Sequence, residues 1–438
     1  MEYHYTGCSR SRIFCHSIML CIMTIMAFRA SSQAPEWKTF TVDNSGLADN
    51  IVFTIAFQDN GTKWIGTNDG LSKFDGSNWT TYRMNNSGLP ANIVSCLMLD
   101  EADKVWIGTD GVFTTNGGGL AIFDGVNWEV YKPSNSIIPD DWVTSIVTDK
   151  GMNKWIGTDN GLVKYDGTNM TILPASYYTY YASVAALDIE GDSVVWIGTG
   201  SGLSRYDNGA WTVYHTGSSG LPADNIWEVK IDTLGNKWIG TNGGGLAKFD
   251  GTDWTVFNSS NSCLPVNDVT SIAIDKSYTL WLGTWQGGLV SYDGTTWTVY
   301  NTSNSLIPSD IIYSVALDKY ENKWIGTPSG LAIFNKGGIL GVDDKPSGGQ
   351  EGYPFLLEQN RPNPFTSLTT LSFSLEKQGH VILKVLDCQG NEVARPVNKV
   401  MSPGHYDIEW DGSFLPTGIY TCILLVNGVI MVKQMVRF

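Results

Sequence analysis

The chain has 438 residues, of which 42% are hydrophobic, and its formal net charge is −15 at pH 7. This length and composition suffice for a sizeable core and for two domains, which argues against a disordered chain. The negative field repels nucleic acid, polyanionic glycans and anionic lipid, so partners of these classes are not expected.

Residues 1–34 have the layout of a secretory signal peptide. Arg10 and Arg12 precede an apolar run over 13–28, and small residues follow from Ala30 to Ala34. A basic start, a short apolar segment and small residues at the cleavage point are typical of such peptides. We therefore expect export to the periplasm and then a secreted or outer-surface location, with a retained membrane anchor as the alternative. No later stretch approaches 18 apolar residues, so the mature chain is expected to have no membrane span.

Residues 35–338 are organised by a repeated tetrapeptide, Trp-Ile/Leu-Gly-Thr. A second module follows it in most copies, with a Gly-Leu step, an Asp-Gly step and a run such as Trp-Thr-Val-Tyr. A period of forty-odd residues is the signature of a repeat array. The tetrapeptide begins at Trp64, Trp106, Trp155, Trp196, Trp238, Trp281 and Trp324.

Each repeat predicts four short β-strands, which is the content of one β-propeller blade. The Asp-Gly steps lie between the third and fourth predicted strands, where glycine allows the positive φ of a hairpin turn. The seventh unit ends at Phe334 without a fourth strand, and an orphan copy of that strand stands at 37–40. If this first strand completes the last blade, the ring closes with seven blades and no open sheet edge. The predicted fold class is therefore all-β, with a seven-bladed β-propeller first.

These units resemble the two-component regulator propeller repeat over roughly Pro35 to Lys336. The resemblance implies an extracellular sensor region or a stand-alone secreted protein. In that family the propeller usually feeds a membrane span and a histidine kinase, and this chain carries neither, so no signalling output is implied.

Residues 339–354 read as a linker, because Pro, Gly and Ser are frequent there. From residue 355 to 438, short alternating strands without the tryptophan repeat predict an immunoglobulin-like β-sandwich. Here the residues resemble the type A C-terminal sorting domain of the type IX (Por) secretion system. The matching elements are Pro362-Asn363-Pro364-Phe365, Trp410-Asp411-Gly412 and Leu415-Pro416-Thr417-Gly418-Ile419-Tyr420. The resemblance implies that this domain contacts the secretion machinery. An ordinary immunoglobulin-like adhesion domain is the alternative.

Four cysteines remain after the predicted signal peptide, which is too few for a disulfide scaffold. Cys388 and Cys422 share the last domain and could pair, whereas Cys96 and Cys263 belong to distant blades.

Ligand-binding residues are expected where the repeat is broken, on the loops and strand starts around the ring's funnel. The repeated tryptophans themselves are better explained as core. Alignment of the repeats places Trp142 and Tyr181 in one column and Phe53, Trp227 and Tyr313 in the next. The predicted funnel-face residues are Phe53, Phe113, Trp142, Tyr181, Trp227, Glu228, Asp268, Trp285 and Tyr313.

An aromatic rim with a few carboxylates suits an extracellular carbohydrate or protein ligand. A glycan lyase or hydrolase using carboxylates at the same face is the first alternative, and a structural or adhesion protein without a small ligand is the second. His215 is the propeller's one histidine and adjoins an outer strand, so no catalytic triad is indicated. No cofactor and no metal site are expected.

Overall fold

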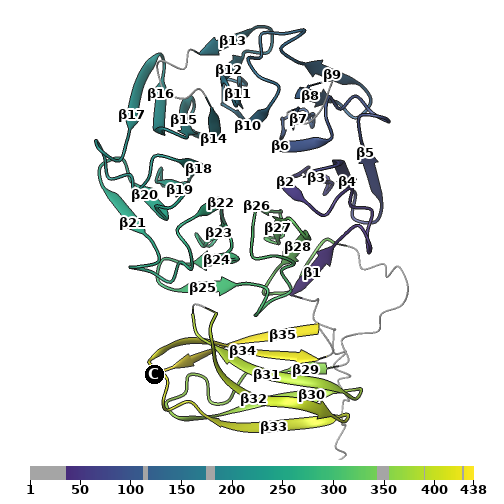
Figure 1. Cartoon of the computed structure of the whole chain (residues 1–438), viewed down its shortest axis with the longest axis vertical. Helices are drawn as coiled ribbons and strands as arrows, with labels where there is room; N and C mark the ends of the chain where they lie inside the picture. The colour runs from purple at the N-terminus through teal and green to yellow at the C-terminus, as the bar shows by residue number, and fades with distance from the viewer. Residues whose placement is uncertain (1–35, 112–116, 174–182, 343–354, 389, 427–428) are drawn as a thin grey trace, which may run out of the picture. The chain divides into compact units, whose positions relative to one another are not determined.

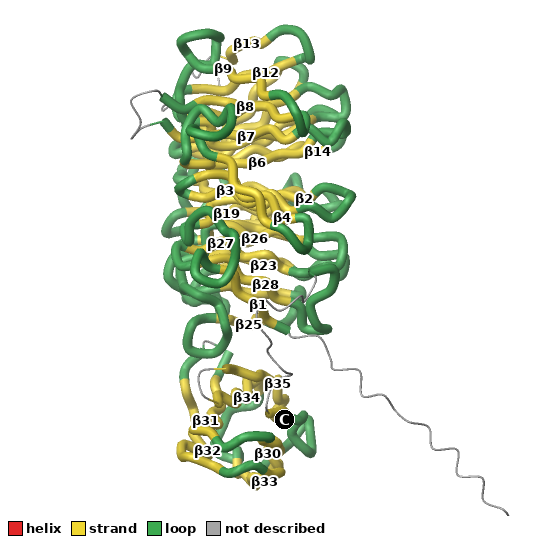
Figure 2. Tube along the Cα trace, turned by 90° about the vertical axis from the view of Figure 1, so that its right-hand side faces the viewer, coloured by secondary structure: helices red, strands yellow, loops and turns green. Residues whose placement is uncertain are grey.

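The computed structural model describes residues 36–111, 117–173, 183–342, 355–388, 390–426 and 429–438. Every regular element in these ranges is a β-strand, and Figure 2 shows only strands and loops there. The predicted signal peptide, most of the predicted linker, Phe113 and Tyr181 lie outside them. No helix in the described part of the chain could cross a bilayer.

Seven four-stranded antiparallel sheets, or blades, follow one another around a ring (Figure 1). Blade 1 begins at residue 52 and blade 7 ends at residue 334. The innermost strands are β2 (Val52–Phe57), β6 (Ile93–Leu99), β10 (Val143–Thr148), β14 (Val184–Glu190), β18 (Ile226–Ile231), β22 (Val269–Ile274) and β26 (Ser314–Leu317). The second strands, which hold the tetrapeptide, are β3 (Lys63–Thr67), β7 (Val105–Asp110), β11 (Lys154–Thr158), β15 (Val194–Thr199), β19 (Lys237–Thr241), β23 (Leu280–Thr284) and β27 (Lys323–Thr327).

In blades 1, 2, 3, 5 and 6 the outer half is a hairpin that turns at the predicted Asp-Gly step. In blade 1, the Oδ1 of Asp75 accepts hydrogen bonds from the backbone N–H groups of Ser77 and Asn78, and these bonds lower the pKa of that carboxyl. The third strands are β4 (Gly70–Phe74), β8 (Gly119–Phe123), β12 (Gly161–Tyr165), β16 (Gly202–Asp207), β20 (Leu246–Phe249), β24 (Leu289–Tyr292) and β28 (Gly330–Phe334). The outermost strands are β5 (Trp79–Tyr82), β9 (Trp128–Tyr131), β13 (Met170–Leu173), β17 (Ala210–Tyr214), β21 (Trp254–Phe257), β25 (Trp297–Tyr300) and β1 (Trp37–Phe40).

The first strand of the chain closes the ring. β1 pairs antiparallel with β28, in the register Trp37↔Phe334 to Phe40↔Leu331, and completes the sheet of β26 and β27. Trp37 is 6% exposed and stacks on Phe334 at a centroid distance of 4.5 Å. The predicted closure and the predicted all-β fold class are therefore confirmed.

The seven repeated tryptophans pack between blades, as the sequence predicted, and none is more than 8% exposed. Six of them donate their indole N–H to a carboxylate six residues earlier, in the turn between the first and second strands. Trp324, for example, donates to Asp318 at 2.9 Å. Blade 1 has Gln58 at that position, and the Nε1 of Trp64 is one of two buried side-chain N or O atoms without a partner among the described residues.

A lysine of the next blade lies over four of these tryptophans. Its ammonium is 5.7 Å or less from the ring centroid, a cation–π distance. The pairs are Lys63 over Trp324, Lys154 over Trp106, Lys237 over Trp196 and Lys323 over Trp281. These lysines belong to blades 1, 3, 5 and 7, whereas blades 2, 4 and 6 have Val105, Val195 and Leu280 at the same position.

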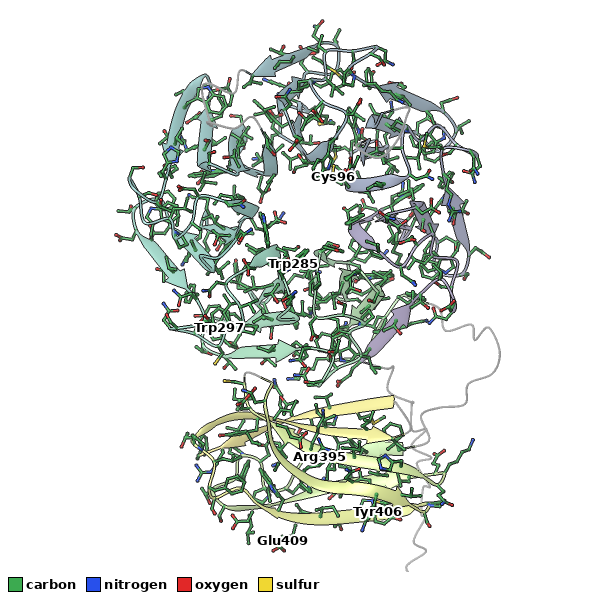
Figure 3. The ribbon with its side chains drawn as sticks, in the orientation of Figure 1. Cys96, Trp285, Trp297, Arg395, Tyr406 and Glu409 are labelled. Carbon is green, nitrogen blue, oxygen red and sulfur yellow. The ribbon has the colours of Figure 1, made fainter. Side chains whose placement is uncertain are left out.

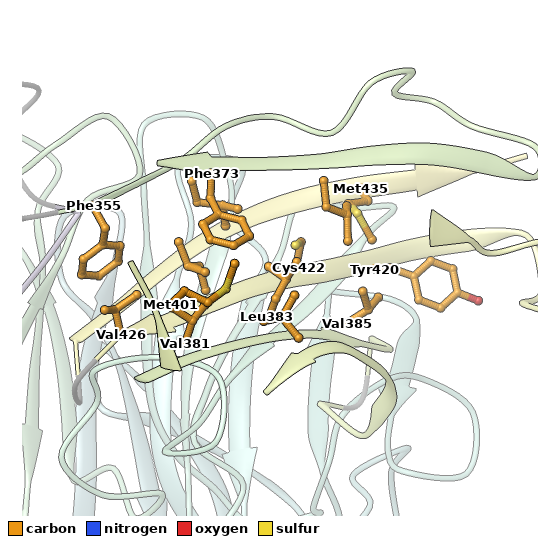
Figure 4. Close-up of a cluster of buried hydrophobic side chains, with 14 of the residues drawn as sticks. Phe355, Phe373, Val381, Leu383, Val385, Met401, Tyr420, Cys422, Val426 and Met435 are labelled. Atoms are coloured by element: carbon orange, nitrogen blue, oxygen red, sulfur yellow. The ribbon is translucent and has the colours of Figure 1, made fainter. Parts of the chain in front are cut away.

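The last seven strands form a two-sheet sandwich, as predicted. One sheet has the order β29-β30-β33 and the other β32-β31-β34-β35. Buried side chains of both sheets, including Phe373, Leu383 and Tyr420, gather between them (Figure 4). The strands are β29 (Phe355–Leu357), β30 (Leu368–Leu375), β31 (Gly379–Leu386), β32 (Glu392–Met401), β33 (Gly404–Asp411), β34 (Gly418–Val426) and β35 (Val429–Arg437).

The suggested bridge between Cys388 and Cys422 is not formed, and the four cysteines of the described residues are free thiols. Cys422 faces the sandwich core on β34, and burial raises the pKa of its thiol to about 12. Burial likewise raises the pKa of Cys96, on β6, to about 12. Both thiols are therefore held in their neutral, weakly nucleophilic form.

Candidate functional site

The innermost strands expose one set of side chains to the ring axis. In β2 and β10 the first and fourth residues are buried and the others are half-buried. In each blade a fully buried aliphatic residue opens the inner-strand repeat, and the residue after it forms the column in which the sequence predicted Phe53, Trp227 and Tyr313. The buried residues are Val52, Val94, Val143, Val184, Ile226, Val269 and Ile312. This column therefore decides what a ligand entering the ring would meet.

In three blades the residue in this column carries a hydroxyl that joins neighbouring blades. Ser95, Thr144 and Thr270 donate at 2.5–2.6 Å to the backbone carbonyls of Val143, Val184 and Ile312, the buried residues that open the repeat in the next blades. Blade 4 has Ala185 at this position. Because these side chains are short, those of blades 2, 3 and 4 extend only a little way toward the axis.

Blades 5, 6, 7 and 1 present aromatic rings instead. Ring centroids are 6.1 Å apart for Trp227 and Trp285, 6.0 Å for Trp285 and Tyr313, and 5.2 Å for Tyr313 and Phe53. Trp285 is 39% exposed, and Figure 3 places it on the inner side of the ring. We call Trp227, Trp285, Tyr313 and Phe53 the aromatic arc. The structure thus brings together four of the nine predicted residues.

A fifth predicted residue holds the arc in place. The backbone N–H of Trp285 donates to the carbonyl of Asp268 at 3.0 Å. The Oδ1 of Asp268 accepts from the N–H of Gly243, in the corresponding loop of blade 5, at 2.8 Å. Asp268 therefore ties the loop that carries Trp285 to the corresponding loop of blade 5.

The loop that presents Trp285 is strained. Gln286 has φ = 75°, and Gly243, its equivalent in blade 5, has φ = 84°. A non-glycine residue in the left-handed region costs about 1 kcal/mol, and such strain is concentrated at functional sites.

Glu228 lies on β18 beside Trp227 but belongs to a charged cluster. Burial, the largest effect, raises the pKa of its carboxyl to about 7, against the lowering effect of Lys230. The Nζ of Lys230 is 3.6 Å from the carboxylate of Asp188 on β14, and that carboxylate raises the pKa of Lys230. Asp188 also lines a hollow of about 450 Å³ with Met98, Val147, Thr148 and neighbouring residues.

The sequence prediction missed Asp188 and Lys230, although a signal was present. They lie three residues after the column of Phe53 and Trp227, where the five other blades have only apolar residues. Those residues are Ala56, Met98, Val147, Ala273 and Ala316. At an aligned position where the other blades have apolar residues, a charged residue breaks the repeat. This signal is as clear as an aromatic residue at a position where other blades have a hydroxyl.

Three predicted residues do not join the arc in the described structure. Trp142 is half-buried before β10, and its N–H donates to the Oδ1 of Asp140 at 2.8 Å. Phe113 and Tyr181 lie outside the described residues. The alignment that paired Tyr181 with Trp142 was wrong, because Val184 pairs with Thr199 as Val143 pairs with Thr158. Ser183 is therefore the equivalent of Trp142, and Ala185 is that of Phe53.

Among the described residues there is no group of three or more His, Cys, Asp or Glu side chains that could hold a metal ion.

The family model described as "Two component regulator propeller" matches residues 88–111 and 263–286. Each match runs from the connection before an inner strand through the following Trp-Ile/Leu-Gly-Thr. No curated protein matches the chain.

Several solved structures share the fold. The extracellular domain of a hybrid two component system from B. thetaiotaomicron is 19% identical, with a TM-score of 0.60, over 92% of this chain and 57% of that one. PorZ, a surface component of the type-IX secretion system of Porphyromonas gingivalis, is 16% identical, with a TM-score of 0.56, over 91% and 61%. Virginiamycin B lyase from Staphylococcus aureus is 16% identical, with a TM-score of 0.55, over 68% and 98%.

The chain thus spans about 57–61% of the length of the first two structures. At these identities the likeness concerns the fold alone. The class defined here is a seven-bladed β-propeller that carries two-component regulator propeller repeats and resembles extracellular propellers.

Proposed function

We propose that the protein is a secreted or surface-exposed binding propeller that takes an extracellular ligand on the aromatic arc. The observation that carries this proposal is the exposure of four adjoining rings at positions where other blades have small residues. The seven repeated tryptophans are at most 8% exposed, whereas the rings of the arc are half-buried or exposed. Large rings that stay half-exposed beside one another are suited to recognition.

The surroundings of the arc favour binding over catalysis. The virginiamycin B lyase is catalytically inactive when one histidine is replaced by alanine. The one histidine of this propeller, His215, follows the outer strand β17. Glu228 could serve as a general acid, but Lys230 and Asp188 already surround it. A lyase or hydrolase is therefore the second candidate, and an adhesion protein without a small ligand is the third.

We further propose that residues 1–34 direct export and that residues 355–438 act as a type IX sorting domain. Two observations support this. The sandwich follows the propeller as the resemblance requires, and PorZ, whose fold is similar, is a component of that secretion system.

The binding proposal is tested with the full mature chain on glycan arrays and on extracellular peptide arrays. Trp285→Ala and Trp227→Ala should each lower the binding of any ligand at least about tenfold, the loss expected for an anchor worth more than 1.4 kcal/mol. Tyr278→Ala removes a 52% exposed aromatic outside the arc and should change nothing. Ligands whose binding is unaffected by both tryptophan variants would refute the site.

A further inference from the structure

We infer that the ligand held by the aromatic arc is a basic peptide segment, whose lysine or arginine side chain enters between the rings. This inference rests on the proposed function and adds the chemical class of the ligand. Net charge, ring chemistry and the shape of the inner wall each support it.

The loops of the three blades that hold Trp227, Trp285 and Tyr313 carry carboxylates and neither lysine nor arginine. Two kinds of loop meet on this face, those before the innermost strands and those between the second and third strands, as the hydrogen bonds of Asp268 to Trp285 and Gly243 show. In blades 5, 6 and 7 these loops contain no lysine or arginine, and their one histidine is His215, directly after β17. They span residues 215–225, 242–245, 258–268, 285–288, 301–311 and 328–329.

The same loops hold the carboxylates of Asp224, Asp268 and Asp310, with Glu228 at the start of β18. Cations of this face, such as Arg83 and Lys132, belong to blades 1 and 2, and Arg83 is paired with Asp69 at 3.0 Å. The potential over the arc is therefore negative, which concentrates cations and repels acidic ligands.

The rings themselves favour a cation. The face of an indole or phenol carries negative quadrupole density, which attracts a cation placed over it. Within its core the ring already uses this contact, with the Nζ of Lys323 4.6 Å from the centroid of Trp281. The arc offers the same chemistry on exposed rings.

The opposite wall leaves room for a peptide backbone. Ser95, Thr144 and Ala185 are short, and the two hydroxyls already donate to carbonyls of the next blades. Near the axis, Glu228 and Asp188 face a single cation, Lys230. Because burial raises the pKa of Glu228 to about 7, a nearby ligand ammonium or guanidinium would favour the ionised form of its carboxyl.

The test uses the full mature chain and two fluorescein-labelled dodecapeptides of Gly, Ser and three Arg, identical except that one has citrulline for arginine. Citrulline keeps the planar shape and removes the charge. Fluorescence anisotropy should give at least about tenfold tighter binding for the arginine peptide, and its affinity should fall several-fold from 50 to 300 mM NaCl as charge is screened.

Variants separate the contributions of charge and ring. Asp268→Asn keeps an acceptor for the N–H of Gly243 while removing the charge, and it should weaken arginine-peptide binding about three- to tenfold. Its matched control is Asp124→Asn, in a hairpin turn at the opposite face, which should have no effect. Trp285→Ala should abolish the preference for arginine over citrulline.

Equal affinity for the two peptides, or an absence of binding by both, would overturn the basic-peptide assignment. Neutral chito- and cello-oligosaccharides serve as the other probes. If they bind in a Trp285-dependent manner and the arginine peptide does not, the arc remains a binding site and only the ligand class is wrong. If no probe or array ligand responds to the arc variants, the proposed function fails as well.

Discussion

Trp64 differs from the six other repeated tryptophans in its hydrogen bond. The others donate their indole N–H to an aspartate or glutamate, whereas Gln58 replaces that carboxylate in blade 1 and Trp64 has no acceptor. A buried donor without a partner costs about 1–3 kcal/mol. We predict that Gln58→Asp raises the free energy of unfolding by about 1 kcal/mol.

Urea denaturation of the full mature chain measures this gain. Asp318→Ala, which removes the acceptor of Trp324, should destabilise the protein by about 1–3 kcal/mol. An unchanged or lower stability of Gln58→Asp would show that the indole of Trp64 does not need this partner.

Glu228 predicts a pH dependence of stability. Its folded-state pKa is about 7, above the ordinary value of 4.5, mainly because burial disfavours the charged form. Between these two values the folded state binds the proton more tightly, so stability falls as pH rises from about 4.5 to about 7. Since water reaches the half-buried carboxyl, we expect a loss on the order of 1–2 kcal/mol rather than the full value of burial.

Glu228→Gln should remove this loss. The variant is expected to be more stable than the parent at pH 8 and close to it at pH 4.5, as measured by denaturation at both pH values. A parallel shift at the two pH values would contradict the assignment.

At the residue scale, the sequence predicted the four residues of the arc. It did not predict which of them are in contact, nor the charged residues near them. Phe53 and Tyr313 come from opposite ends of the propeller sequence and touch only because β1 closes the ring. Asp188 and Lys230 were not predicted, because only two aligned positions of the inner strand were compared across the blades. Contacts between blades depend on the geometry of the closed ring, and the sequence of a single repeat does not determine that geometry.

At the element scale, strand order and closure followed from the sequence because turn residues and alternation repeat in every blade. Blade 4 was the exception. The other connections carry a tetrapeptide of Ser, any residue, Leu or Ile, then Pro or Ala, such as Ser-Gly-Leu-Pro at 87–90. The connection of blade 4 lacks it, so the alignment had no landmark and was displaced by two residues at Tyr181.

Strand β1 should be the most sensitive element of the ring. We predict that Trp37→Ala costs about 3–5 kcal/mol, the usual range for a buried tryptophan, and loosens the edge of β28. Sedimentation should then show association that increases with concentration, because an unpaired edge recruits other chains.

Trp254→Ala is the matched variant, since Trp254 lies on the outer strand β21 of an internal blade. It should destabilise the protein without promoting association. Equal association of both variants would argue against a special role for the closing strand.

At the scale of the whole molecule, the two terminal segments should be sufficient for export. A reporter that carries residues 1–34 at its start and 355–438 at its end should reach the cell surface or medium of a Bacteroidota host with an active type IX system. The same reporter with residues 1–34 alone should stay in the periplasm. Fractionation and surface protease treatment measure the difference, and equal distribution of the two reporters would refute the sorting role.

The lysines that lie over tryptophans belong to blades 1, 3, 5 and 7. Blades with and without such a lysine cannot alternate all the way around a ring that has an odd number of blades. Two lysine-bearing blades must meet once, and they meet between blades 7 and 1, where Lys63 covers Trp324 beside the closing strand. The ring thus has a seam that its near-symmetry conceals. Engineered rings that lose or gain one blade should tolerate the change best at this seam. With an even number of blades, those with and without the lysine can alternate there without interruption.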